Sequence, residues 1–503
     1  MTRRAALLRE IVAVLAAAAV TALVAIHLGV SDRAFLVYAD GDSMLPALVQ
    51  GAVRAGEPLD LSFSSPLFLP ELGLFLALGA LGLPIGATLL LQGIANWLAL
   101  YAAIRFAAGA SRDRRAPLAA VVAFGVVAAL ALLESSPDRD ALQGASLLFT
   151  GTYYSATVVG TVLLFGLLAR RWHAPRRPVV LVALTAAVTA LSTLTNPLSL
   201  LWGSGPLVVL AGVGMATRVI RPRAALLGIA ALAVGAAVGM LGRIPFAPLI
   251  AQDAGEKLQP DHAADSVRYY AGLVADLART PAGSAEIALV LLCLAGAVVA
   301  TVVGLRRRDP FATIAGTFAW FAPLLVVVAV VLAGTMAARY LQPVFVLPPL
   351  ALLPLVRSLP RPRAVLAAPG ALALLLVLVA PGALAPARLP TEVAADLACV
   401  DRWVADSGET GAGQFWTVRA PKAYAADPRR LVQVDAAMNP YLWLVDAEDY
   451  RGLRAVSFVI DSPDSPATRL TAPVGATPTV TVCGRYTITD YGAPVLPLGT
   501  PHH

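Results

Sequence analysis

The stretch 38–70 reads YADGDSMLPALVQGAVRAGEPLDLSFSSPLFLP and is the first long polar segment after the first apolar run of the chain. It places Asp40 and Asp42 directly behind that run. Two interpretations of these aspartates are open. Asp-Gly is turn chemistry, and Asp42 with Ser43 would cap a helix that begins near Met44. A pair of carboxylates at a membrane surface also suits acid–base catalysis.

The composition indicates a polytopic membrane protein. Of 503 residues, 58% are hydrophobic and only 14% are charged, and the mean hydropathy is +0.75. Soluble domains carry roughly one quarter charged residues. The net charge of +7 would suit a nucleic-acid partner, but the basic residues fall in short clusters between apolar runs, where they set orientation in a bilayer. We therefore expect the lipid bilayer, and not nucleic acid, as a partner.

Eleven apolar runs have spanning length or nearly so. They cover residues 11–30, 85–104, 117–133, 153–168, 178–195, 197–217, 224–241, 287–303, 311–332, 341–356 and 365–379. The first run follows two arginines but has no convincing cleavage site for a signal peptidase, so we predict a retained helix. A further apolar segment, 67–83, is preceded by proline breaks, and we expect it to lie in or dip into the outer interface.

The basic residues between the runs predict the orientation. With eleven spans, one side of the membrane receives twenty arginines and the other side eight basic residues. The richer side is expected to be cytoplasmic. We therefore predict a multi-pass protein of the plasma membrane with a cytoplasmic N-terminus and an outer C-terminus. A full crossing at 67–83 would invert every later loop and place most of the arginines outside.

Acidic and aromatic residues gather on the predicted outer side. Two outer loops, 31–66 and 242–286, are longer than topology requires, which is typical of functional loops. For the tyrosines at span ends, an aromatic belt at the interface is the alternative, and for Arg339 a snorkelling helix-end charge. The candidate substrate-binding residues on this side are Tyr153, Tyr154, Asn196, His262, Arg268, Arg339 and Tyr340.

The composition changes after the last apolar run. Residues 387–503 are mixed polar, with strand-like patterns at 455–460 and 479–492. The predicted fold class is an all-α polytopic membrane domain, 1–386, followed by a small extracytoplasmic α/β domain. Cys399 and Cys483 fall in this outer domain, and we predict that they form a disulfide. The domain shows no metal-ligand spacing, nucleophile elbow or phosphate loop.

The order of these features resembles the GT-C superfamily of polyprenyl-phosphate-sugar-dependent glycosyltransferases, which includes protein O-mannosyltransferases and aminoarabinose transferases, and in particular actinobacterial membrane proteins of this kind. The family places an acidic motif at the start of a large first outer loop, then a Pro-containing lead into an interfacial helix, and Arg-Tyr before a late Pro-rich span. The counterparts are DGD at 40–42, ALVQGAVRAG at 47–56, SSPLFLPELGLFLALGALG at 64–82 and RYLQP at 339–343. In this chain a glycine separates the two acids, and the usual Pro-Pro pair is reduced to Ser-Pro.

The resemblance implies an inverting transfer of a hexosyl or pentosyl group from a polyprenyl-phosphate donor to a hydroxyl of a cell-envelope glycan or protein. Asp42 would accept the hydroxyl proton. Asp40 would be its partner or a ligand of a divalent metal such as Mg²⁺ or Mn²⁺. Arg339 would hold the leaving lipid phosphate, which suits the fork of a guanidinium.

Two other functions are open. A transporter or flippase of a lipid-linked or polar substrate would need polar groups near the middle of the bilayer, for which Gln92 and Asn96 are the main candidates. A non-catalytic protein that binds cell-envelope glycans would use the outer domain. Its aromatic residues Trp403, Trp416, Tyr441 and Trp443 would then line a glycan surface, or else form the core of the domain.

Overall fold

The computed structural model describes residues 3–56, 58–109, 113–173, 178–251, 259–359, 394–469 and 477–502. Within these ranges the chain is mostly helical, and seven segments are long and apolar enough to cross a membrane. They are α1 (Arg3–Val30), α5 (Ile85–Ala107), α6 (Ala116–Leu133), α10 (Pro222–Gly242), α13 (Pro281–Arg307), α14 (Pro310–Leu332) and the segment Ala338–Arg357. The chain is therefore a multi-pass membrane protein.

Three further predicted spans are also helical. They correspond to α7 (Ser155–His173), α8 (Pro178–Thr195), and the π-helical turn η3 (Leu200–Ser204) continued by α9 (Gly205–Ala216). The predicted span at 365–379 lies outside the described residues. The total of eleven spans therefore stays a prediction.

The apolar segment expected at the interface forms α4 (Leu69–Gly79). Eleven helical residues extend about 17 Å, whereas the hydrocarbon core of a bilayer is about 30 Å thick. The helix is therefore too short to cross. A proline lies in its first turn, where an N–H group would have no hydrogen-bond partner within the helix.

The predicted span at 341–356 is not one continuous α-helix. It consists of η6 (Ala338–Leu341), α15 (Pro343–Val346), η7 (Pro348–Ala351) and α16 (Leu352–Arg357). Proline lacks an N–H group and clashes with the preceding turn, so the four prolines of this segment divide it into short pieces. Its residues are nonetheless largely buried within the bundle.

Small residues bring some of the helices close together. A Cβ atom at Gly235 of α10 would lie 2.4 Å from the carbonyl oxygen of Ala186 on α8, and one at Gly239 would lie 2.6 Å from that of Ala190. The spacing of these glycines is the small-xxx-small pattern by which membrane helices approach each other. The α8–α10 pair therefore depends on the absence of side chains there.

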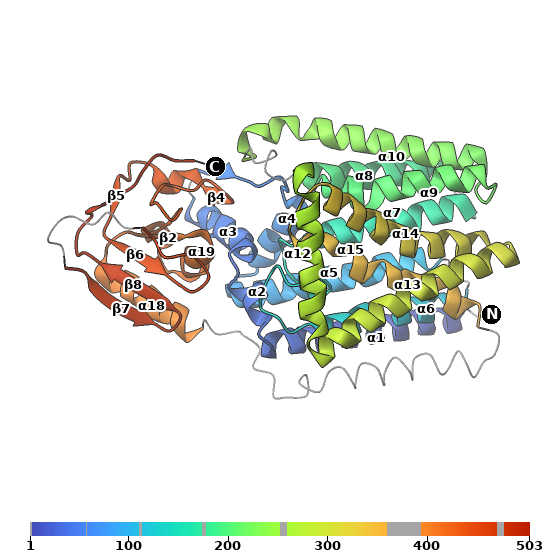
Figure 1. Ribbon diagram of the computed structural model, residues 1–503, viewed down its shortest axis with the longest axis horizontal. Helices are drawn as coiled ribbons and strands as arrows, with labels where there is room; N and C mark the ends of the chain where they lie inside the picture. The colour runs from blue at the N-terminus through green and yellow to red at the C-terminus, as the bar shows by residue number, and fades with distance from the viewer. Residues whose placement is uncertain are drawn as a thin grey trace.

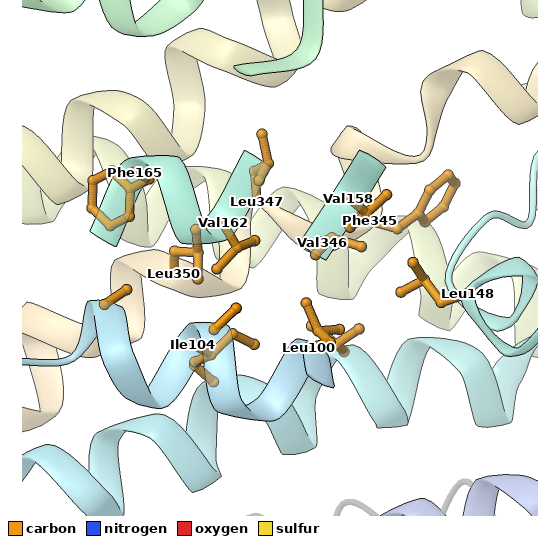
Figure 2. Packing of buried hydrophobic residues seen from close by; sticks show 14 of the residues in the cluster. Leu100, Ile104, Leu148, Val158, Val162, Phe165, Phe345, Val346, Leu347 and Leu350 are labelled. Atoms are coloured by element: carbon orange, nitrogen blue, oxygen red, sulfur yellow. The ribbon is translucent and has the colours of Figure 1, made fainter. Parts of the chain in front are cut away.

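The centre of the bundle is apolar. Figure 2 shows side chains from α5, α7 and the broken segment after η6 pointing toward one another. Phe165 of α7 also stacks on Phe318 of α14, with ring centroids 4.8 Å apart. The labelled members of this core are Leu100, Ile104, Leu148, Val158, Val162, Phe165, Phe345, Val346, Leu347 and Leu350.

The two long loops contain structure of their own. The first holds α2 (Ala34–Tyr38), η1 (Asp42–Met44), α3 (Leu45–Ala55) and β1 (Leu61–Ser62), at the end of the bundle that faces the C-terminal region (Figure 1). The loop before α7 holds η2 (Ser146–Phe149). After α10 come η4 (Ile244–Leu249), η5 (Pro260–His262) and α12 (Ala263–Ala278), and α12 runs across the direction of the bundle helices (Figure 1). The chain begins at the opposite end of the bundle.

The C-terminal region is built on a five-stranded mixed sheet in the order β3-β2-β6-β8-β7. Strands β2, β3 and β6 are parallel, and β8 and β7 continue the sheet antiparallel. Its elements are α18 (Ala395–Ser407), β2 (Gly411–Gln414), α19 (Phe415–Tyr424), η9 (Pro428–Arg430), β3 (Leu431–Val434), β4 (Val445–Asp446), η10 (Ala447–Tyr450), β5 (Ala455–Val456), β6 (Phe458–Asp461), β7 (Thr479–Cys483), β8 (Tyr486–Asp490) and β9 (Leu496–Pro497). A disulfide joins Cys399 of α18 to Cys483 of β7, with 5.5 Å between their Cα atoms.

The first loop is held between the bundle and the C-terminal region. Strand β1 pairs with β4 in an antiparallel ladder. The hydroxyl of Tyr424 donates to the backbone oxygen of Tyr38, and the guanidinium of Arg139 lies 3.5 Å from the ring centroid of Trp416. The stretch that carries the two aspartates thus has partners on both sides.

Candidate active site

Asp40 is fully buried, and both of its carboxylate oxygens accept hydrogen bonds from other groups of the protein. Its Oδ1 accepts hydrogen bonds from the Tyr153 hydroxyl at 2.7 Å and from the backbone N–H of Asp42 at 3.1 Å. Its Oδ2 accepts from Nε of Arg139 at 2.9 Å. The bond from the Asp42 N–H to Asp40 closes a turn over Gly41, which is the N-cap residue of η1 and makes no side-chain capping bond. The predicted helix cap by Asp42 and Ser43 is not formed, because α3 begins after Met44 without a side-chain cap and the Ser43 hydroxyl donates to the backbone oxygen of Leu36.

Asp42 is the open member of the pair. No hydrogen bond or ion pair engages its carboxylate among the residues that the structure describes. Burial and the charge of Asp40 raise its pKa to about 6, although Arg339, Arg419 and Arg139 act in the opposite direction. A carboxylate with a pKa near the working pH accepts a proton readily, so Asp42 has the properties of a general base.

Arg339 and two tyrosines form the side of the site next to the bundle. Arg339 donates through Nη1 to Asp140 at 3.3 Å, while its buried Nε has no hydrogen-bond partner within the described ranges. Its guanidinium lies 5.8 Å from the ring centroid of Tyr340, and that ring lies 5.9 Å from the ring of Tyr154. The guanidinium of Arg339 therefore still has an N–H group that can donate to a ligand.

Tyr154 has a strained backbone. Its φ of 65° lies in the left-handed region, which is rare for a bulky residue. This conformation lies directly before α7, and Tyr153 is fixed there by the Gln342 amide, which donates to the Tyr153 backbone oxygen at 2.7 Å. Such strain persists only where the surroundings impose it, and it is common at functional sites.

The C-terminal region contributes Arg419. This arginine of α19 is buried, and its Nε donates to the backbone oxygen of Gly41 at 2.6 Å. Nη1 donates to Gln433 at 3.2 Å and to the backbone oxygen of Leu444, whereas Nη2 is buried without a partner in the described residues. A cation from the far end of the sequence therefore lies against the turn between the two aspartates.

Gly41 is closely packed at that contact. A Cβ atom on Gly41 would lie 3.0 Å from the rings of both Phe415 and Trp416. A larger residue between the two aspartates would therefore press on these rings, and they would have to shift to accommodate it.

The loop that carries Arg139 and Asp140 is anchored by a buried polar network. Arg33, 1% exposed, lies 3.4 Å from the Glu134 carboxylate and donates to Ser146 at 2.6 Å and to the backbone oxygen of Gln143 at 2.9 Å. Glu134 in turn accepts from the backbone N–H groups of Ala145 and Ser146. Because each of these groups is paired, the network holds both ends of the loop in place.

Sequence reasoning missed Arg139 and Arg419. The signal for Arg139 was present, since it lies in the acidic and basic run Asp138-Arg139-Asp140 on the side predicted to be outer. Arg419 had no such signal, because it lies in a separate region of mixed composition. Only the docking of α19 on the first loop brings it to the site.

Three predicted residues are not part of this cluster. Asn196 donates to Thr157 and accepts from the backbone N–H of Leu198, so it shapes the turn after α8. His262 and Arg268 both pair with Asp265 on the exposed surface of the η5–α12 segment. The structure therefore brings together Asp40, Asp42, Tyr153, Tyr154, Arg339 and Tyr340 from the prediction, and leaves these three elsewhere.

The aspartates do not fit the protein ligand set of a divalent metal. Both oxygens of Asp40 accept hydrogen bonds from other groups, one of them from a cationic guanidinium. Among the described residues no group of three His, Cys, Asp or Glu side chains has a metal-binding arrangement. We therefore assign no step to a metal held by Asp40.

A comparison of the sequence with protein-family models and with curated proteins finds no match in either. The chain is therefore assigned to no family, and the likeness to GT-C glycosyltransferases rests on the motifs quoted above. What the site does has to be inferred from its own geometry: a partnered buried aspartate, an open one beside it, and three arginines around them.

Proposed function

We propose that this protein is a glycosyltransferase that uses a polyprenyl-phosphate-linked sugar and acts at the outer face of the plasma membrane. The observation that carries the proposal is the open carboxylate of Asp42, with a pKa near 6, among the guanidinium groups of Arg139, Arg339 and Arg419. A transferase of this type needs a base for the acceptor hydroxyl and a cation for the phosphate that leaves.

The reaction divides between these groups. The acceptor hydroxyl gives its proton to Asp42 while its oxygen attacks the anomeric carbon. The bond between that carbon and the phosphate oxygen breaks on the opposite face, so the configuration inverts. The bond electrons stay on the lipid phosphate, whose added negative charge is stabilised by Arg339.

The charges of the cluster support this division. Arg139 is neutralised by Asp40 at 2.9 Å, and Arg339 forms a longer ion pair with Asp140 at 3.3 Å. Arg419 is held by backbone and amide oxygens and not by a carboxylate. Arg419 has no carboxylate partner in the described residues, and Arg339 keeps a buried Nε without a hydrogen-bond partner there beside its ion pair with Asp140, so these two arginines are the ones suited to an incoming phosphate.

The proposal requires the site to lie outside the cytoplasm. The twenty-to-eight distribution of basic residues supports that orientation. A reporter enzyme that works only in the cytoplasm, fused behind the last residue, is expected to be inactive. An active reporter would place the site on the side of the membrane where the proposed reaction does not occur.

The test of the reaction uses purified full-length protein with a polyprenyl-phosphate sugar and a hydroxyl acceptor. Asp42→Asn keeps the shape of the side chain and removes the base, so we expect a loss of about a hundredfold or more in rate. The matched control is Asp265→Asn, which changes an exposed carboxylate outside the cluster and should keep the parent rate.

Asp40→Asn separates the two aspartates. If Asp40→Asn abolishes transfer while Asp42→Asn does not, their roles are exchanged. If both variants transfer sugar at the parent rate, or if the parent shows no transfer with hexosyl and pentosyl donors, the proposed site is wrong.

A further inference from the structure

A cavity lies among the helices, apart from the aspartates. It has a volume of about 290 Å³ and is enclosed by α4, α5, α7 and α8. Leu191 at its edge is 53% exposed, and Ala99 is exposed as well, so the cavity reaches the face of the bundle that lipid would cover. Its wall is mainly apolar, with Leu74, Ala95, Ala99, Val159, Leu163, Val188 and Leu191.

Polar groups lie along this apolar wall. Asn96 of α5 and Ser192 of α8 line the cavity and are both partly exposed. Asn96 uses its amide N–H to bind the backbone oxygen of Thr150 at 3.1 Å, which leaves its side-chain oxygen toward other partners. Polar side chains within membrane helices are costly and usually face a functional cavity.

Glu71 marks one end of the cavity. It is 2% exposed, and its Oε1 accepts from the backbone N–H of Ala156 at 3.1 Å. Its Oε2 has no hydrogen-bond partner among the described residues, and the same is true of Oγ1 of Thr195 in the same wall. Buried polar atoms without partners are rare in folded proteins, so each needs an explanation.

The charge of the wall limits what binds there. No lysine, arginine or histidine lines the cavity in the part of the chain that the structure describes. A phosphate or a carboxylate would therefore enter without a cation, at a large desolvation cost. An ionised Glu71 would meet the same cost, so the protonated carboxyl, which both donates and accepts, is the favoured form.

We propose that this cavity binds the hydroxyl end of a neutral, single-chain lipid alcohol, with Glu71, Asn96 and Ser192 as its hydrogen-bonding partners. The apolar chain leaves past Leu191 toward the bilayer. A volume of about 290 Å³ is at the lower end of the roughly 300 to 1,000 Å³ of small-ligand pockets, which suits the hydroxyl and the first part of a chain. The site is separate from the proposed donor site at Arg339 and does not require glycosyl transfer.

The test compares three photoreactive probes on the purified full chain in nanodiscs. They are a diazirine-bearing undecanol, the matching undecane and the matching undecyl phosphate. We expect saturable labelling by the alcohol on peptides of α4, α5, α7 and α8. Labelling by the alkane should be about tenfold weaker because the alkane cannot form the hydrogen bond. Labelling by the phosphate should be weaker by about the same factor because the cavity wall offers no cation to pair with its charge.

Two variants locate the site. Ala95→Phe fills the cavity and should abolish the saturable labelling, whereas Ala183→Phe, on the exposed face of α8 and outside the wall, should not change it. Equal labelling by alcohol and alkane would reduce the cavity to a nonspecific apolar crevice and overturn the proposal. Stronger labelling by the phosphate, or unchanged labelling of Ala95→Phe, would overturn it as well.

Discussion

Replacing Asp42 by asparagine should stabilise the protein at neutral pH while it removes the proposed base. The pKa of Asp42 is raised from 3.8 to about 6, so the folded state holds this proton more tightly than the unfolded state does. Stability therefore falls as the pH rises from about 4 to about 6, and the full cost remains above that range. The difference between 3.8 and about 6 corresponds to at most about 3 kcal/mol, so we expect Asp42→Asn to stabilise the protein by about 1 to 3 kcal/mol at neutral pH.

The neighbouring aspartate should respond in the opposite direction. Asp40 is buried, pairs with the partly buried Arg139 and accepts a hydrogen bond from the Tyr153 hydroxyl, so Asp40→Asn leaves this guanidinium without its carboxylate. Removal of one partner of a buried ion pair costs about 3 to 5 kcal/mol. Two chemically identical substitutions, two residues apart, are thus expected to change stability with opposite signs.

The assay is thermal unfolding of each purified variant in the same detergent at pH 4, 5, 6 and 7.5. The advantage of Asp42→Asn over the parent should be absent at pH 4 and complete at pH 7.5. An Asp42→Asn protein that is less stable than the parent at pH 7.5, or whose advantage is the same at every pH, would refute the reasoning about the open carboxylate.

Three other substitutions follow from the fold. Arg419→Met removes a positive charge that lowers the pKa of Asp42, so the acid limb of the pH–rate profile should move up by about one unit, and an unmoved limb would contradict this. Cys399→Ser opens a loop that spans 84 positions and should destabilise the C-terminal region by about 2 to 5 kcal/mol, measured by proteolysis of that region. Gly235→Leu should destabilise the α8–α10 pair by about 1 to 3 kcal/mol, whereas Gly212→Leu, with open space around it, should not; equal thermal stability of the two variants would count against the close packing.

Hydropathy and charge predicted much of the membrane domain, because long apolar helices are required wherever backbone crosses lipid. The distribution of basic residues argued against a crossing at 67–83, and α4 is indeed too short to cross. Irregular backbone was not predictable in the same way. The left-handed Tyr154 and the division of 341–356 into short helical pieces depend on local proline chemistry and on partners such as Gln342 that come from distant parts of the sequence.

The site was predictable to the extent that its members adjoin a span. Asp40, Asp42 and Arg339 lie near apolar runs on the side predicted to be outer, and the resemblance to GT-C proteins suggested that they act together. Which aspartate is open was beyond the sequence, because it depends on where Arg139 and the Tyr153 hydroxyl lie in space. Arg419 was beyond it as well, since a contact across 378 positions leaves no periodic signal.

The contact between the first loop and the C-terminal region can form only late in the synthesis of the chain. Arg419 reaches back 378 positions to Gly41, and the β1–β4 ladder closes a loop of similar length. At about 5 to 20 residues per second, the acidic turn leaves the ribosome about 20 to 80 s before its last partners exist. During that interval the nascent chain carries the aspartates without α19, so an incomplete or truncated chain cannot present the finished site to the membrane.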